Sequence, residues 1–359
     1  MIRRMRVVMD GTGGAAGWPE PGCRCASCAG AAAGRGARAR SAVLVDGGGL
    51  RLDLAGGGLP AGGDQYIVRE LPGGWDVTGP DGERLLCAAG PGAVPDDAAP
   101  YDYAVLDMLG DPAQLGALRR RGLITDSTAV AIGRVDHRAA SERSLAGLCG
   151  LWRVQLVGDG DEIRLRRYVS RERRVLVIGG ARSGKSERAE LRVAAEPAVT
   201  YVATGADGTG DPEWAARVAA HRARRPAWWR TAETTDLAGL LAAGGTAADA
   251  GLTADRTGTL LIDGIGTWLA AVMDRCGAWD GSPGAAERLT AETVGLVRAW
   301  RETCYRLVAV SDEVGLGVVP ETPAGRLFRD ELGRLNQALS RESEMTEFVV
   351  AGRVMPLPL

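Results

Sequence analysis

The 359-residue chain is almost without lysine. Lysine and arginine together number 43, and Lys185 is the only lysine, so the remaining 42 are arginine. The near absence of lysine indicates a compositional bias that acts on the whole sequence. The exception at residue 185 therefore indicates a position that needs a compact ammonium group, which a planar guanidinium does not replace.

Other absences narrow the class of protein. No stretch approaches 18 consecutive apolar residues and the N-terminus lacks a signal-peptide-like apolar run, so the sequence predicts no membrane span and a cytoplasmic location. A formal net charge of −2 gives no general electrostatic reason to expect nucleic-acid binding. Seven cysteines, an odd number, do not form a disulfide framework. The hydrophobic fraction of 45% is typical of a globular protein.

The length favours two domains, with a boundary at the charged segment RRYVSRERR, residues 166–174. Residues 1–170 contain short β-like runs between glycines and prolines, with helical stretches near 112–121 and 139–149, which predicts a β-rich α/β domain. Residues 171–359 alternate continuous apolar strands with amphipathic helices. That alternation predicts a mostly parallel sheet covered by helices.

A phosphate-binding motif begins the second domain. Gly179 to Ser186 match G-x-x-x-x-G-K-[ST], after the strand VLVI and before the helix-forming SERAELRV. The glycines let backbone N–H groups converge on phosphate oxygens beside the positive end of the helix. Lys185 would reach the β- and γ-phosphates, and the Ser186 hydroxyl would hold Mg²⁺. The alternative is a glycine-rich turn in which the only lysine lies by accident.

Two further residues are candidates from their context. Asp263 ends the apolar strand LLID, where it would face Mg²⁺ or the nucleotide, or would merely cap the next helix. His221 lies among Arg222, Arg224 and Arg225, whose charges favour the neutral imidazole and leave a nitrogen lone pair to attack phosphorus. These arginines would also hold a triphosphate. The alternative for His221 is a solvated helix end.

From about residue 173 to 355 the chain resembles the bifunctional adenosylcobinamide kinase and adenosylcobinamide-phosphate guanylyltransferase of cobalamin biosynthesis. The resemblance rests on GGARSGKS (179–186), YVATG (201–205), the run H-R-x-x-R-P-x-x-W-R-T-x-E from His221 to Glu233, and EVGLGVVPE followed by RLFRDELGRLNQ within 313–337. It implies a P-loop NTPase-like α/β fold. One position departs from the family pattern, since Asp312 stands where asparagine is expected.

The resemblance implies two reactions. A nucleoside triphosphate, GTP or ATP with Mg²⁺, first phosphorylates the aminopropanol hydroxyl of adenosylcobinamide. GMP from GTP then passes through His221 to adenosylcobinamide phosphate and gives adenosylcobinamide-GDP. His221 and Lys185 would be catalytic, Ser186 would bind the metal, and the enzyme would be a homo-oligomer. The implied nucleotide site comprises Gly179, Gly180, Ala181, Arg182, Ser183, Gly184, Lys185, Ser186, Thr204, Gly205, Ala206, Arg222, Ala223, Arg224, Arg225, Glu233 and Asp263.

Two other functions compete with this one. The first is a P-loop small-molecule kinase that lacks nucleotidyl transfer, and covalent labelling of His221 discriminates against it. The second is a nucleotide-binding scaffold that uses the N-terminal half to engage a partner, and turnover of adenosylcobinamide separates it from the enzyme.

The segment GTGGAAGWPEPGCRCASC (11–28) resembles the opening of metallo-β-lactamase-fold proteins of the phosphodiesterase type. Cys23, Cys25 and Cys28 could ligate zinc, but the sequence offers no obvious fourth ligand, and a reduced, metal-free loop is the alternative. Hydrolases of that fold use an H-x-H-x-D-H cluster, whereas residues 1–170 contain only His137. We therefore expect a degenerate, non-hydrolytic domain in which His137 is structural.

Overall fold

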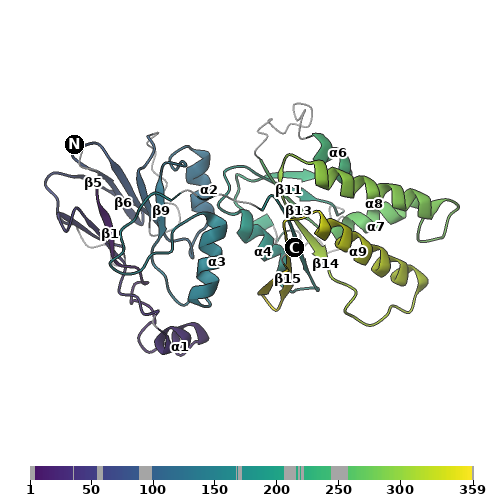
Figure 1. Cartoon of the computed structure of the whole chain (residues 1–359), viewed down its shortest axis with the longest axis horizontal. Coiled ribbons are helices and arrows are strands. Elements are labelled where there is room, and N and C mark those ends of the chain that lie inside the picture. The colour runs from purple at the N-terminus through teal and green to yellow at the C-terminus, as the bar shows by residue number, and fades with distance from the viewer. Residues whose placement is uncertain are drawn as a thin grey trace. The chain divides into compact units, whose positions relative to one another are not determined.

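The computed structural model describes residues 5–34, 36–54, 60–88, 99–166, 168, 172–205, 216, 219, 222–243 and 258–357. The chain divides into two compact units (Figure 1). Unit 1 comprises Met1–Val169 and Ala194–Pro197, and unit 2 comprises Ser170–Val193 and Ala198–Leu359. None of the helices among the described residues has both the length and the apolar character needed to cross a bilayer.

Within its described residues, unit 1 contains two sheets. One is antiparallel with the order β1-β2-β3-β4, and the other has the order β5-β6-β7-β8-β9. In the second sheet β5, β6 and β7 pair antiparallel, whereas β7, β8 and β9 pair parallel. The strands are β1 (Val7–Gly11), β2 (Ala42–Val45), β3 (Leu50–Asp53), β4 (Ala61–Gly62), β5 (Ile67–Leu71), β6 (Gly74–Thr78), β7 (Arg84–Ala88), β8 (Tyr103–Leu106) and β9 (Ala129–Ile132).

Three helices belong to unit 1 in the described part of the chain: α1 (Ala26–Ala33), α2 (Ala113–Arg120) and α3 (Glu142–Trp152). Helices α2 and α3 occupy the two stretches in which the sequence predicts helix. The core draws on both sheets because alternate strand residues face inward. Its members include Val7, Met9, Val43, Val45, Leu50, Leu52, Trp75, Val77, Leu85 and Val105.

In the described part of unit 2 a seven-stranded sheet has the order β12-β11-β13-β14-β10-β15-β16. All neighbours are parallel except β15 and β16, so the predicted mostly parallel sheet is confirmed. The strands are β10 (Arg174–Gly179), β11 (Val199–Ala203), β12 (Arg230–Glu233), β13 (Thr259–Asp263), β14 (Arg306–Asp312), β15 (Met345–Val350) and β16 (Arg353–Leu357). The helices with described bounds are α4 (Lys185–Val193), α6 (Leu237–Ala242), α7 (Ile265–Cys276), α8 (Ala285–Glu302) and α9 (Pro323–Arg341).

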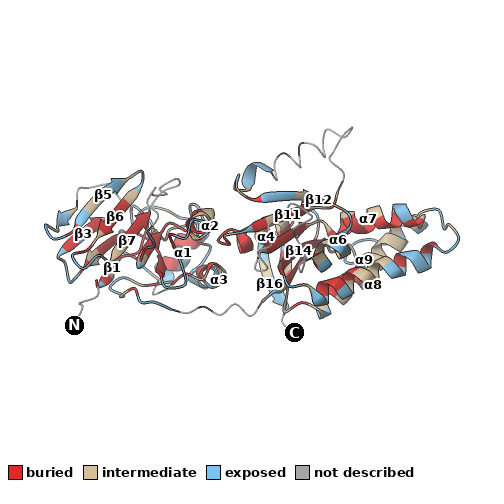
Figure 2. Cartoon of the chain, turned by 90° about the horizontal axis from the view of Figure 1, so that it is seen from above, coloured by how far each residue is buried: buried red, intermediate tan, exposed pale blue. Residues whose placement is uncertain are grey.

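Helices cover both faces of this sheet, as the continuous apolar strands require. In β10, Val175 and Val177 pack with Ala189 of α4 on one face. Leu176 belongs to the other face, where the core includes buried residues of α6, α7, α8 and α9. Figure 2 shows β14 as buried and the edge strand β12 as largely exposed.

The parallel strands bring five chain segments to one edge. Register pairs Gly179 with Asp312 and Ala203 with both Asp263 and Glu233, so the carboxyl ends of β10, β11, β12, β13 and β14 lie together. Ligands of open α/β sheets bind outside these carboxyl ends. The fold therefore places the segments of the predicted nucleotide site side by side.

A buried ion-pair network fixes α4 to the sheet. Arg188 donates to Glu347 of β15 from Nη2 at 2.6 Å and from Nε at 2.9 Å, and Arg192 donates from Nη1 at 2.6 Å. The second guanidinium nitrogen of Arg192 pairs with Glu172. Burial raises the pKa of Glu347, but the two arginines outweigh it and hold the pKa below its usual value. At neutral pH Glu347 is therefore ionised in the folded unit.

We expect Glu347→Gln to destabilise unit 2 by about 3 kcal/mol, because it leaves the buried guanidinium of Arg192 and the partly buried one of Arg188 without their shared carboxylate. Urea unfolding, monitored by hydrogen exchange of peptides from α4 and β15, would measure the loss of unfolding free energy. The exposed pair Arg301–Glu342, with 2.6 Å between nitrogen and oxygen, offers a matched control, and Glu342→Gln should cost less than about 1 kcal/mol.

The pH dependence of this effect has a definite sign. A carboxyl whose pKa is lowered by folding contributes stability above its unfolded pKa and loses it as pH falls. The difference between the parent and Glu347→Gln should thus be full above the reference pKa of 4.5 and shrink below it. Equal stability of the two proteins at neutral pH would contradict the assigned role of the network.

Candidate active site

The loop between β10 and α4 has the backbone that a phosphate cradle needs. Gly184 has a φ of 95° and Arg182 a φ of 56°, so the chain turns through the left-handed region twice before α4 begins. Gly179 accepts no side chain, since a Cβ there would lie 2.6 Å from both Ser183 Oγ and the Val349 carbonyl oxygen. The tight turn aims the following N–H groups into one concavity at the N-terminus of α4.

Lys185 is the first residue of α4 and is only 6% exposed. Its Nζ donates to the Gly180 carbonyl oxygen at 3.2 Å and lies 2.9 Å from Asp312 Oδ1. The ammonium is thus held over the loop by one carbonyl and one carboxylate. A phosphate oxygen that enters the loop would replace one of these two oxygens as a partner of the ammonium.

Asp263 lies beside the start of α4, as the sequence predicts for a Mg²⁺-directed carboxylate. Its Oδ1 accepts from Ser186 Oγ at 3.2 Å, and its Oδ2 accepts from the Tyr201 hydroxyl at 2.7 Å. Burial, with a smaller contribution from Asp263, raises the pKa of Tyr201 far above its usual value, so the phenol remains a donor. One hydroxyl and one carboxylate oxygen at this point are the hard oxygen ligands that suit Mg²⁺.

Thr204 connects the ends of β11 and β13. Its buried hydroxyl donates to the Gly264 carbonyl oxygen at 2.6 Å and lies 2.7 Å from Thr267 Oγ1. Gly264 has a φ of 119°, which only glycine adopts readily, and a Cβ there would approach Thr204 Oγ1 to 3.0 Å. Thr204 therefore fixes the turn that carries Asp263 toward the loop.

The arginines after residue 221 contact acidic and aromatic groups of the same edge. Arg222 pairs with Glu233 at 3.1 Å, and Arg224 pairs with Glu190 of α4 at 3.1 Å. The Arg225 guanidinium lies over the Tyr201 ring, 3.6 Å from its centroid. These contacts place the basic run next to the phosphate loop and the Tyr201–Asp263 pair. His221 and Ala206 lie outside the described residues.

Two residues of this site were not among the sequence candidates. In the sequence Asp312 stands out only as a departure from a family pattern, and Tyr201 only as part of YVATG. Their roles follow from register, because Asp312 ends the strand beside β10 and Tyr201 lies in the strand beside β13. A carboxylate at the end of the apolar strand RLVAVSD is the signal that could have found Asp312.

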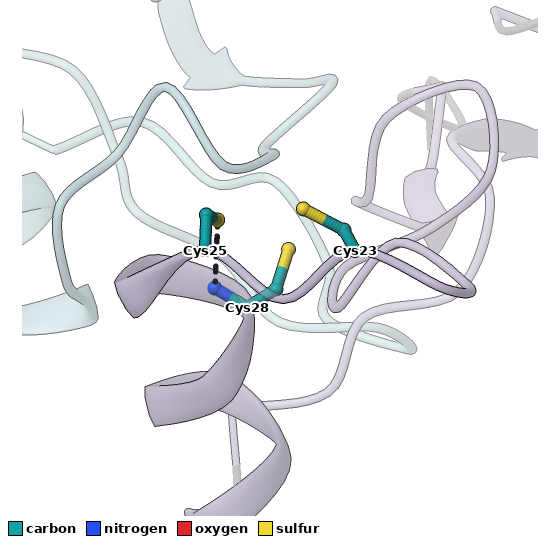
Figure 3. A group of neighbouring side chains, drawn as sticks. All are labelled: Cys23, Cys25 and Cys28. Atoms are coloured by element: carbon teal, nitrogen blue, oxygen red, sulfur yellow. Dashed lines mark hydrogen bonds between the residues drawn. The ribbon is translucent and has the colours of Figure 1, made fainter.

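A second candidate site lies in unit 1. The sulfur atoms of Cys23, Cys25 and Cys28 lie within 4.8 Å of one another (Figure 3), and ligand atoms of Glu20, Cys23 and His137 form a second group of the same size. Cys25 Sγ accepts from the Cys28 N–H at 3.4 Å. His137 Nδ1 lies 2.9 Å from Glu20 Oε2, an arrangement that orients an imidazole and leaves its other nitrogen for a metal.

The structure thus brings His137 close to Cys23, one of the three thiols, which the sequence did not indicate. Three cysteines and one histidine are a donor set of structural zinc sites, and here Cys23 belongs to both groups of ligand atoms. We expect the purified full chain to contain about one zinc ion by elemental analysis. Cobalt substitution should give sulfur-to-cobalt absorption, and Cys25→Ser or His137→Ala should weaken metal retention. Cys304, an exposed cysteine, provides the control Cys304→Ser. If the parent protein contains no zinc, the alternative holds, in which the three cysteines belong to a reduced, metal-free loop.

Similarity to known proteins extends over about half of the chain. A sequence model described as cobinamide kinase / cobinamide phosphate guanyltransferase matches residues 175–357. The bifunctional adenosylcobalamin biosynthesis protein CobP of Pseudomonas aeruginosa is 42% identical over 186 residues, which cover 51% of this chain and 96% of the relative. The CobU proteins of the same description from Salmonella typhimurium and Escherichia coli are 36% and 34% identical over 185 residues, covering 50% of this chain and 96% of each relative.

Proposed function

The chain belongs to the cobinamide kinase / cobinamide phosphate guanyltransferase family, and we propose that residues 171–359 carry out both reactions. The substrate would be adenosylcobinamide, which is phosphorylated and then converted to adenosylcobinamide-GDP. The observation that carries this function is the junction of Lys185, Ser186, Asp263 and Asp312 at one edge of a parallel sheet. We also propose a cytoplasmic homo-oligomer.

In the kinase step the loop from Gly179 to Ser186 binds the triphosphate through its N–H groups. Lys185 leaves Asp312 and neutralises the β- and γ-phosphates as the acceptor hydroxyl attacks the γ-phosphorus. The bond from the γ-phosphorus to the bridging oxygen breaks, the nucleoside diphosphate leaves, and the hydroxyl proton is released to solvent. Ser186 and Asp263 would hold Mg²⁺, which supplies charge neutralisation at the phosphates when bound.

In the guanylyl step His221 attacks the α-phosphorus of GTP, and pyrophosphate leaves as the phosphorus–nitrogen bond forms. Arg222 and Arg224, which now pair with Glu233 and Glu190, can turn to the phosphates. A phosphate oxygen of adenosylcobinamide phosphate then attacks the same phosphorus. The phosphorus–nitrogen bond breaks, His221 is regenerated, and a diphosphate links GMP to the substrate.

A turnover assay tests this proposal. The full chain is incubated with adenosylcobinamide, Mg²⁺ and either GTP or ATP, and products are separated by liquid chromatography and identified by mass. We expect the phosphate ester first and adenosylcobinamide-GDP only when GTP is present. The ester alone under all conditions would support the simple kinase. A folded protein that binds GTP and turns over no corrinoid would support the scaffold.

For residues 1–170 we propose a degenerate metallo-β-lactamase-like domain without hydrolytic activity. Among described residues, the groups of histidine, cysteine and acidic side chains that could hold a metal involve only Glu20, the three cysteines and His137. Asp107, just after β8, is instead paired with Arg138 at 3.1 Å. These residues do not fit a multi-histidine two-metal centre, which supports a structural or partner-binding role.

A further inference from the structure

The segment that joins β14 to α9 exposes three large apolar side chains. Leu316 is 78% exposed, Val318 94% and Val319 56%. Single exposed apolar residues are ordinary, but three within four positions are a concentration of exposed apolar surface of the kind that binding sites show. We call residues 314–320, VGLGVVP, the apolar loop; it contains no charged side chain.

The apolar loop is tied to the active site at its start. It follows Asp312, which contacts Lys185 at 2.9 Å, and the Glu313 N–H donates to the Gly179 carbonyl oxygen at 3.0 Å. Val314 packs against the core of unit 2. The start of the apolar loop is therefore hydrogen-bonded to the strand end at which the phosphate-binding loop begins.

The far end of the apolar loop is fixed as well. Arg326 Nη1 donates to the carbonyl oxygens of Pro320 and Glu321 at 3.0 and 2.7 Å. Thr322 caps α9 by accepting from the Gly325 N–H at 3.1 Å. Because both ends are held, the three exposed side chains are presented on an anchored loop, which lowers the entropy lost when a ligand covers them.

The chemistry of the proposed reaction determines what could cover the patch. The acceptor hydroxyl must come within about 3–3.5 Å of the γ-phosphorus. That hydroxyl ends a short aminopropanol arm, so the corrin macrocycle behind it must lie on the surface next to the phosphate loop. The rim of a corrin carries methyl groups, which favour contact with aliphatic side chains over water.

We propose that Leu316, Val318 and Val319 form the contact surface for the corrin macrocycle of adenosylcobinamide. This inference rests on the proposed function and assigns its acceptor subsite. The nucleotide occupies the phosphate loop, the aminopropanol arm reaches past Asp312, and the macrocycle rests on the apolar loop. The patch acts in substrate binding and has no part in GTP chemistry.

The test is the triple variant Leu316→Ser, Val318→Ser, Val319→Ser in the full chain. Val294→Ser on α8 is the matched control, because Val294 is 61% exposed and lies outside the active-site edge. Both proteins are compared with the parent for adenosylcobinamide affinity by calorimetry, for covalent labelling by GTP labelled at the α-phosphorus, and for mass in solution by light scattering.

We expect the triple variant to bind adenosylcobinamide at least about 10-fold more weakly, with labelling by GTP and mass unchanged. Unchanged affinity would overturn the inference. A fall in mass with unchanged affinity would overturn it in favour of an interface between copies of the chain. A parent that binds GTP but no adenosylcobinamide would refute the proposed function itself, and this failure appears before any substitution is made.

Discussion

The variant His221→Ala should form no covalent adduct with GTP, whereas the parent should carry a label from the α-phosphorus. Imidazole attack on that phosphorus creates a phosphoramidate, which is labile in acid and stable in alkali. A neutral imidazole is needed for the attack, because its nitrogen lone pair forms the new bond. Removal of the nucleophile leaves no second route to the same bond.

The scarcity of histidine makes this experiment unusually clear. His137 and His221 are the only two, so peptide mapping of the labelled protein has two candidate sites to distinguish. Binding of a fluorescent GTP analogue by His221→Ala would show that the nucleotide site remains folded. Label retained in the variant, or mapped to an oxygen nucleophile, would contradict the histidine mechanism. Absence of label in a parent that still phosphorylates adenosylcobinamide would favour the simple kinase.

The local features of the active site could be predicted from sequence because they are contiguous in the chain. The motif from Gly179 to Ser186 specifies its own strand, turn and helix start, and the structure contains all three. Asp263 could be predicted because a carboxylate at the end of an apolar strand lies at the ligand-binding edge. The family motifs supplied the rest of the function, which spacing alone left open.

Contacts between distant segments could not be predicted in this way. Lys185 meets Asp312 only because β10 and β14 are parallel neighbours in this register. The hydrogen bond from Tyr201 to Asp263 likewise depends on the pairing of β11 with β13. His137 lies close to Cys23 although more than a hundred residues separate them in the chain, so the sequence alone indicates no fourth ligand for the three cysteines. Strand order decides the first two contacts and the approach of two loops decides the third; composition and periodicity encode neither.

Lys185→Arg should lower kcat/KM for phosphorylation of adenosylcobinamide by about 10²- to 10³-fold, equivalent to about 3–4 kcal/mol of transition-state stabilisation. The Lys185 side chain is buried between the Gly180 carbonyl and Asp312, in a space that fits one ammonium. A guanidinium is broader and planar, so it cannot place a single point charge between the β- and γ-phosphates. Initial rates at varied adenosylcobinamide concentration would measure the loss.

An arginine-to-lysine substitution elsewhere in the chain provides the control. Arg298 is exposed on α8, away from the active-site edge, and Arg298→Lys should keep the parent's rate. Labelling by GTP adds a second readout, because the departing pyrophosphate contains both phosphates that Lys185 would bind. We expect Lys185→Arg to slow labelling as well. Normal labelling with slow phosphorylation would show that Lys185 acts only on the γ-phosphate. Rates within about 3-fold of the parent in both assays would show that a positive charge alone suffices at residue 185.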